Sequence, residues 1–321
     1  MHVVRDFLRA KGLAMSAATW DELYARRIEP ALAEGTLTVA DLRGLLREVE
    51  ECGRQHVFLF RCNPQRAAHA ISPAQIQIAV AAMGLAALMN NPLDLELPDA
   101  PEIVDIRGIP AGDGMPTSLL IKQVETRTTN AFLRADYDEA REEMSRVYSV
   151  IKKRAVNVAR LYEDGLLELR IASQDNSTRY QDNVKAFFAA LKPLINGDDF
   201  VPISLAKAKA RIWNEQDQLN GQIRFSQSEA RNDFGYSMNV ASSSQSDSLS
   251  SDDGSRAALQ SFLDNDGKVT RTNIYFRIPD DEQNREVHVL LSGEINEFAI
   301  PASCAAEEYQ YVRGKIQSFN S

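Results

Sequence analysis

The sequence predicts an α+β protein in which a helical N-terminal domain precedes a mainly antiparallel sheet domain with a few helices. Three observations lead to this prediction. Apolar residues recur at helical spacing through most of the first ninety residues. A segment rich in proline and glycine follows. Beyond it, runs with a period of two, bounded by turn residues, predominate. We therefore expect a helical domain at 1–91 and a sheet-rich domain at 117–321, joined by a linker at 92–116.

The helical domain contains recognisable start signals. Thr19 is a predicted N-cap, with Glu22 three residues later to complete a capping box. Pro30 disfavours helical angles at Glu29, so the end of this helix is uncertain. Thr38 is predicted to cap another helix over 41–51, and a short strand over 56–61 follows. A further helix is expected over 72–89.

The second part of the chain reads as strands and helices in alternation. Strands are expected at 118–129 and 146–162, with 166–171 following a tight turn that contains Gly165. The acidic segment 136–143 is expected to be a short helix or a crossover. Further helices are expected at 180–195 and 256–263, at 204–218 (where a strand is the alternative) and after 302. Further strands are expected at 222–228, 234–240, 269–278, 286–291 and 294–300.

Bulk properties narrow the class of protein. The formal net charge is -9 at pH 7, which is not typical of nucleic-acid binders, so any such role would depend on a local basic patch. Three cysteines in 321 residues favour a reducing compartment, and we expect a cytoplasmic protein. Residues 67–93 carry no charge, yet prolines and glutamines interrupt them. They are expected to form a core helix rather than a membrane span.

Motifs for catalysis or metal binding are weak. The set Cys52, His56, Cys62 and His69 has zinc-ligand chemistry without the usual close pairing. The glycines at 108, 112 and 114 lead into a strand rather than a helix, unlike the glycines of a phosphate-binding loop. The segment 264–267 begins like a calcium-binding loop, but the glutamate expected at the twelfth position of such a loop is Tyr275. Asp164 with Glu168 and Arg170 approaches a metal-dependent nuclease pattern, with arginine in place of lysine. We expect no enzymatic activity, no metal and no cofactor.

The marked charge asymmetry lies between 144 and 160, where five basic residues occur without an acid. On a sheet, such residues can follow a phosphate backbone, and Tyr148 or Tyr162 could stack on bases. The alternative is a solvated face that discourages edge pairing. The candidate nucleic-acid-binding residues are Lys122, Arg127, Arg146, Lys152, Arg154 and Arg160.

The segment Glu34–Cys62 contains Thr-Val-Ala-Asp-Leu and then Leu-Leu-Arg-Glu-Val-Glu-Glu-Cys-Gly-Arg-Gln-His-Val-Phe-Leu-Phe. It resembles the end of the helical N-terminal domain of the centromere protein N family. The resemblance covers about thirty residues and the order of the domains. It implies a helical domain before a sheet-rich domain, which together hold DNA and a chromatin partner, and it implies no particular functional residue.

These observations favour a non-catalytic binding or adaptor protein that uses a basic sheet face for a nucleic acid or an acidic partner. Two alternatives stay open. The first is a structural subunit of a multiprotein assembly without nucleic-acid binding, and the second is a divergent metal-dependent nuclease. The abundance of alanine and arginine suggests a bacterial source, where an accessory role in phage defence is one expectation.

Overall fold

The computed structural model describes residues 2–110, 116–174, 180–242, 247–279 and 284–321. Its contacts divide the chain into two compact units. Unit 1 combines residues 1–57 with 203–321, and unit 2 consists of residues 58–202. The predicted α+β class is confirmed, with helices at the N-terminus and antiparallel strands beyond them. The division between units does not coincide with the predicted linker at 92–116, which lies inside unit 2.

Unit 2 is a sheet with helices on one face. Its strand order is β2-β3-β4-β5-β1, and β6 pairs with β1. Strand β1 begins in unit 1 and ends in unit 2. The strands are β1 (Gly53–Arg61), β2 (Glu102–Pro110), β3 (Pro116–Asp138), β4 (Glu143–Tyr162), β5 (Leu166–Ala172) and β6 (Val201–Pro202), and the helices are α5 (Pro64–Ala70), α6 (Pro73–Ala82) and α7 (Gln181–Leu191).

The main core of unit 2 lies between this sheet and the three helices. Apolar residues that alternate along the strands, such as Leu119 and Ile121 of β3, face Ile76 of α6 and Phe187 of α7. A smaller cluster on the opposite face of the sheet includes Val124 and four other buried residues, with Leu95 packed against them. Both faces of the inner part of the sheet are therefore covered.

The predicted linker is an integral part of unit 2. Residues 102–110 form β2, which pairs with β3 along its length. The prolines before it run beside the sheet, where Leu93 N–H donates to Val104 O (2.8 Å) and Thr126 Oγ1 donates to Pro98 O (2.7 Å). Proline-rich composition removes donors without preventing a segment from accepting hydrogen bonds from neighbouring strands. The prediction of an extended connection rather than an element at 92–116 is therefore wrong for 102–110, while residues 111–115 lie outside the described part of the chain.

Unit 1 contains the N-terminal helices and a second group of strands. Within it the strand order is β11-β10-β9-β7-β8, with β1 beside β11. Its helices are α1 (His2–Ala10), α2 (Trp20–Leu23), α3 (Glu29–Ala33), α4 (Val39–Glu51), α8 (Ala206–Asn214), α9 (Gln216–Leu219), α10 (Asp253–Asp264) and α11 (Ala306–Asn320). Its remaining strands are β7 (Ile223–Asn232), β8 (Ser237–Ala241), β9 (Gly267–Arg277), β10 (Glu286–Leu291) and β11 (Glu297–Ser303).

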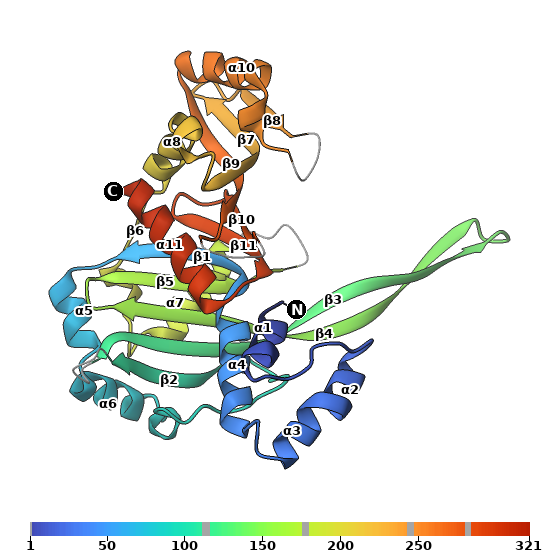
Figure 1. The fold of residues 1–321 in the computed structure, drawn as a ribbon, viewed down its shortest axis with the longest axis vertical. Coiled ribbons are helices and arrows are strands. Elements are labelled where there is room, and N and C mark those ends of the chain that lie inside the picture. The colour runs from blue at the N-terminus through green and yellow to red at the C-terminus, as the bar shows by residue number, and fades with distance from the viewer. Residues whose placement is uncertain (1, 111–115, 175–179, 243–246, 280–283) are drawn as a thin grey trace. The chain divides into compact units, whose positions relative to one another are not determined.

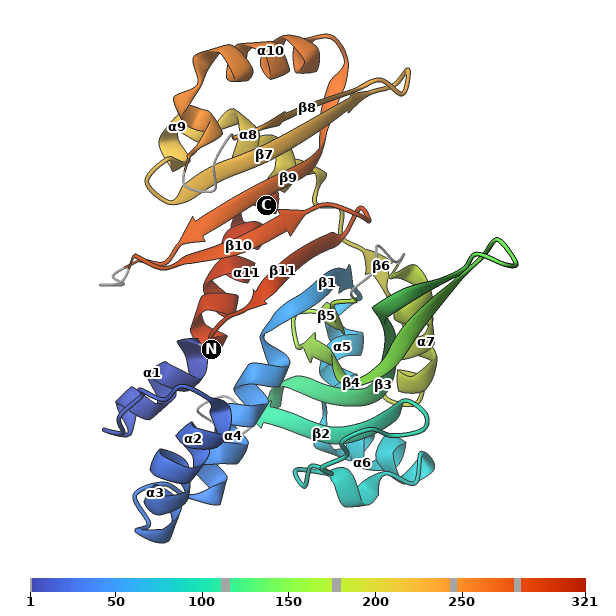
Figure 2. The same cartoon turned by 90° about the vertical axis from the view of Figure 1, so that its right-hand side faces the viewer.

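Three helices pack on one face of the strands of unit 1. Phe276 of β9 stacks on Phe319 of α11 at 6.4 Å between ring centroids. Trp213 of α8 clusters with Ala230 of β7 and Leu259 of α10. Figure 2 shows α8 and α11 behind the strands β7, β9 and β10. The helical prediction for 204–218 is confirmed by α8 and α9.

Two local predictions fail for identifiable reasons. Glu29 adopts helical angles (φ -60°, ψ -47°) before Pro30, which lies in the first turn of α3, and a π-helical turn at Tyr24–Ile28 directly precedes that helix. Such a widened turn accommodates residues that an α-helix excludes. The acidic segment 136–143 is neither helix nor crossover. It closes a hairpin, with β3 reaching Asp138 and β4 starting at Glu143.

The predicted core helix 72–89 is shorter than expected. It consists of α6 and a 3-10 turn at Ala86–Leu88, and α6 buries Ile76 and Val80. Across the described ranges, no helix is both long and apolar enough to cross a membrane.

The replacement of Gly165 by alanine is expected to destabilise unit 2. Gly165 has a φ of +89°, and an added Cβ would lie 2.3 Å from the carbonyl oxygen of Cys62. The turn would have to move and weaken the hydrogen bond from Cys62 N–H to Gly165 O (2.9 Å). We expect a loss of roughly 2 kcal/mol or more in the free energy of unfolding. Urea denaturation followed by circular dichroism measures this loss. Tryptophan fluorescence is not suitable, because both tryptophans, Trp20 and Trp213, lie in unit 1 and the substitution affects unit 2.

A matched control is Gly44→Ala. Gly44 lies inside α4 with no atom within 4 Å of an added Cβ. Alanine favours the helix by about 1 kcal/mol, so this variant should be as stable as the parent or more stable. Equal stability of the Gly165 variant and the parent would show that the turn tolerates a side chain.

A second prediction concerns the capping box of α4. Lys11 Nζ donates to Asp41 Oδ1 (2.6 Å), and Thr38 donates through its N–H and its hydroxyl, which lowers the pKa of Asp41 to about 2. A lowered pKa stabilises the fold above the ordinary value of 3.8 and loses that effect as pH falls towards 2. Asp41→Asn should therefore reduce the melting temperature at pH 7, by a difference that shrinks below pH 4. Asp21→Asn on α2 is the control. A difference independent of pH would contradict this account.

Candidate nucleic-acid interface

Strands β3 and β4 continue well beyond the sheet that anchors them. Among the described residues, β2 pairs with β3 only as far as Val124, and β5 pairs with β4 only from Val158. Further out the two strands pair only with each other, to the turn after Asp138. We call residues 126–138 and 143–157 the arm. Figure 1 shows it projecting from unit 2 as a twisted two-stranded ribbon.

The register of the arm separates its side chains into two faces. Directly opposed residues share a face, and neighbours along a strand alternate. Leu133 is an extra residue in β3, because the register shifts between Phe132 and Arg134. One face contains no acidic residue, and we call it the basic face. Its members are Thr126, Thr128, Asn130, Phe132, Ala135, Tyr137, Met144, Arg146, Tyr148, Val150, Lys152 and Arg154.

Aromatic side chains stand at the middle of the basic face. Phe132 and Tyr148 are directly opposed and form an edge-to-face pair with 5.8 Å between ring centroids. They are 58% and 47% exposed, and Val150 beside them is 66% exposed. Large apolar side chains are usually buried on folding, and a contiguous exposed group of them marks an interaction surface.

Three of the predicted residues share this face. Arg146 and Lys152 are exposed on either side of the aromatic pair. Arg154, at the root of the arm, is half-buried, and its Nε donates to Leu95 O (2.7 Å). Burial lowers the pKa of the Arg154 guanidinium, but arginine remains protonated in proteins. These three cations and the aromatic pair constitute the candidate interface.

Two other predicted residues lie on the same side of the sheet without belonging to an open surface. Lys122 is 4% exposed and stands opposite Asp105 of β2. Arg160 donates from Nε to Ser118 Oγ (3.2 Å), and its guanidinium lies 4.8 Å from the ring centroid of Tyr162. The predicted convergence of six cations is thus corrected here, because the inner part of the sheet is covered.

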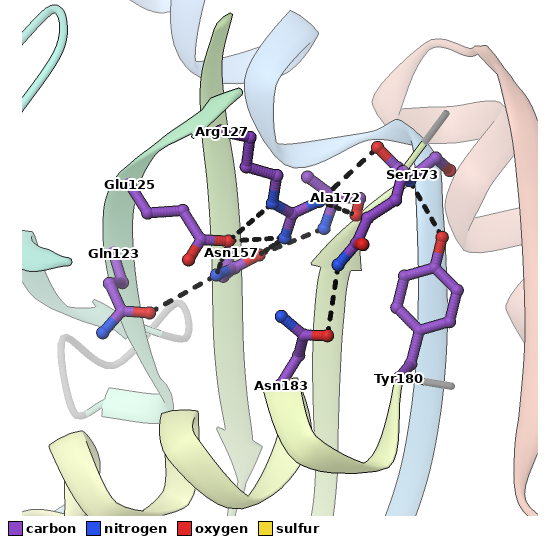
Figure 3. A network of polar contacts seen from close by, with 9 residues as sticks. Gln123, Glu125, Arg127, Asn157, Ala172, Ser173, Tyr180 and Asn183 are labelled. Carbon is purple, nitrogen blue, oxygen red and sulfur yellow. Dashed lines mark hydrogen bonds and ion pairs between the residues drawn. The ribbon is translucent and has the colours of Figure 1, made fainter. Parts of the chain in front are cut away.

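Arg127 lies on the opposite face of β3, in a polar network at the root of the arm (Figure 3). Its Nε donates to Glu125 Oε1 (2.8 Å), and one Nη donates to Ala172 O. The same carboxylate oxygen accepts from Asn157 Nδ2 (3.2 Å). The guanidinium is thereby directed to the protein's own acceptors, so Arg127 does not join the basic face.

This network replaces the strand pairing that ends there. Strand β5 ends at Ala172, whose N–H donates to Asn157 Oδ1 (3.1 Å) instead of to a backbone carbonyl. Asn157 Nδ2 also donates to Gln123 Oε1 (3.3 Å). Side chains therefore satisfy backbone groups where β3 and β4 leave the sheet. They also hold the root of the arm in a defined direction.

The other candidate motifs, for metal binding and for a nuclease, consist of residues that are buried or bonded within the fold. Cys52 and Cys62 are buried and form no disulfide, burial raises the pKa of Cys62, and no group of metal-ligand side chains gathers among the described residues. Glu168 is fully buried, with Oε2 2.6 Å from an Nη of Arg170. Asp164 accepts from Leu166 N–H (3.0 Å) in the turn before β5. Two glycines of the predicted loop, 112 and 114, lie outside the described residues.

The sequence analysis did not identify the outer part of the arm. Phe132 and Tyr137 lie beyond the strand end predicted at 129, whereas Tyr148 was among the expected stacking residues. The available signal was the even spacing of apolar and aromatic residues on β4, where Met144, Tyr148 and Val150 fall on one face of a strand. A strand of that length needs a partner of equal length, which would have extended β3.

Arg127→Ala is expected to loosen the root of the arm. The substitution leaves the carboxylate of Glu125 and the carbonyl of Ala172 without this donor, which typically costs about 1–3 kcal/mol locally. Hydrogen exchange should become faster in 126–132 and 150–157, while the rest of unit 2 keeps its protection. Arg134→Ala is the control, because its exposed ion pair with Asp136 contributes little. Equal exchange in both variants would contradict the anchoring role.

A scan of the sequence against protein-family models gives no match, and a search of curated proteins likewise gives none.

Proposed function

We propose that this protein is a non-catalytic nucleic-acid-binding protein that holds a single-stranded segment against the basic face of the arm. One observation carries the proposal. Arg146, Lys152 and Arg154 share an acid-free face with the exposed pair Phe132 and Tyr148. Cations that contact phosphates and aromatic rings that stack on bases are the two elements of single-strand recognition.

The spacing on β4 supports this assignment. Arg146 and Lys152 lie two and four residues from Tyr148, which at about 3.3 Å per residue corresponds to roughly 7 and 13 Å. A strand of nucleic acid along the ribbon would place phosphates near both cations and a base near the aromatic pair. Exposed rings favour unpaired bases, because bases within a duplex are already stacked.

The charge distribution limits how strong this binding is. Three cations can release counterions from about three phosphates, which predicts a slope near -2 in a plot of log affinity against log salt concentration. The chain as a whole carries -9 and opposes the approach of a polyanion. We therefore expect the basic face of the arm to bind nucleic acid with moderate affinity that weakens as the salt concentration rises. The resemblance to the centromere protein N family, which implies domains that together hold DNA, also supports nucleic-acid binding.

Reversal of two charges on the basic face is expected to remove binding. Arg146→Glu with Lys152→Glu changes both exposed cations and places acids beside the aromatic pair. We expect at least a tenfold loss of affinity for a fluorescent thirty-nucleotide single-stranded DNA at 50 mM salt, measured by anisotropy. Phe132→Ala should weaken binding with little change in the salt slope, because it removes stacking and no charge.

The matched control is Lys185→Glu with Lys192→Glu. These lysines are exposed on unit 2 away from the arm, and the change in net charge is the same. An equal loss of affinity in the control would mean that only bulk charge matters. If the parent binds neither DNA nor RNA at low salt, the proposal is wrong, and the exposed apolar residues favour the alternative of an assembly subunit. Cleavage of the probe with magnesium would favour the nuclease.

A further inference from the structure

The arm is the part of unit 2 that its neighbouring elements leave most exposed. Among the described residues, β3 pairs with no strand other than β4 beyond Val124, and β4 pairs with no strand other than β3 before Val158. Five large apolar side chains of the basic face are exposed: Phe132, Tyr137, Met144, Tyr148 and Val150. A two-stranded ribbon on its own is marginally stable in water. A surface that covers the basic face would therefore stabilise the arm.

Charge changes sign along the arm. The turn at its tip and the adjoining strand ends carry Asp138, Glu139, Glu142 and Glu143, with Arg141 as the single base there. Asp138 accepts from backbone N–H groups of the turn and pairs with Arg141 at 3.8 Å. The three glutamates make no ion pair with any residue in the described part of the chain. The root, in contrast, carries Lys152, Lys153 and Arg154.

The two charged regions are equally far from the aromatic pair. Along β4, Tyr148 lies five residues from Glu143 and five from Lys153. It also lies six residues from Glu142 and six from Arg154. At about 3.3 Å per residue, each separation is roughly 16–20 Å. A rotation of 180° about the aromatic pair therefore exchanges the acidic tip with the basic root.

We propose that two copies of this chain pair through their arms, antiparallel and with their basic faces in contact. The two-fold axis would pass beside the Phe132–Tyr148 pair, so the aromatic residues of both copies pack together at the centre. Glu142 in the turn of one copy would lie beside Arg154 of its partner, with Lys152 next to it on the same face. In such an isologous interface, every contact is made twice.

This pairing deepens the proposed function, because it supplies a regulator of the same face. The acidic tip of one copy occupies the position that phosphates would occupy on its partner. A second copy and a nucleic acid would therefore compete for the basic face. The competition rests on the proposed function, whereas the pairing of arms does not.

The test uses the full chain with its charges exchanged in two separate variants. A tip variant carries Glu139→Lys and Glu142→Lys, and a root variant carries Lys152→Glu and Arg154→Glu. Sedimentation velocity at 1–100 µM and 100 mM salt should give a dimer for the parent and monomers for each variant, because like charges then meet twice. An equimolar mixture of the two variants should dimerise again, since both tip–root contacts become attractive. Recovery in the mixture also shows that both variants are folded.

Two results would overturn the pairing of arms. One is a parent that stays monomeric up to 100 µM. The other is a dimer that persists in both variants, which would place the contact on another surface. Anisotropy with single-stranded DNA separates the two proposals. The tip variant should bind it more tightly than the parent does. A monomeric parent that binds DNA contradicts only the pairing, and a dimer that binds none contradicts only the proposed function.

Discussion

The antiparallel pairing of β3 with β4 is the constraint on which the candidate interface depends. Twenty residue pairs join the two strands, yet fewer than half of them lie within the sheet of unit 2. Past that point, no third strand among the described residues shares the hydrogen bonds. The direction of the arm is then determined at its root, where Arg127, Asn157 and Glu125 satisfy backbone and side-chain groups. Without those contacts, the pairing of β3 with β4 would still align the exposed residues with one another, but the arm would lose its side-chain anchors at the edge of the sheet.

Much of the fold could be predicted from local patterns. Capping residues such as Thr19 and Thr38 marked helix starts, because their side chains satisfy backbone donors nearby in the sequence. The long strand β4 was evident from its β-branched and aromatic residues. The outer part of β3 was not, because the extra residue Leu133 interrupts its period of two and the acidic segment after it resembles a loop.

The candidate site was harder to predict, for a tertiary reason. A sequence shows where cations lie along a strand, but their burial depends on where neighbouring strands end. Lys122 is buried and Arg160 is half-buried because β2 and β5 extend past them, whereas Arg146 and Lys152 are exposed because neither strand reaches that far. Strict alternation along β3 separates Arg127 from Lys122, so the prediction of one shared face for both was wrong. The contacts of Arg127 with Ala172 and Asn157 could not have been inferred from spacing.

Unit 1 is built from two separate stretches of the chain, and unit 2 from one continuous stretch between them. This has a consequence for synthesis. A ribosome completes residues 58–202 before it makes β7–β11, so unit 2 can fold while the first 57 residues still lack those strands. Domains generally fold as they emerge. The helices α1–α4 must therefore wait through most of translation, and a chain released early would present them without their core.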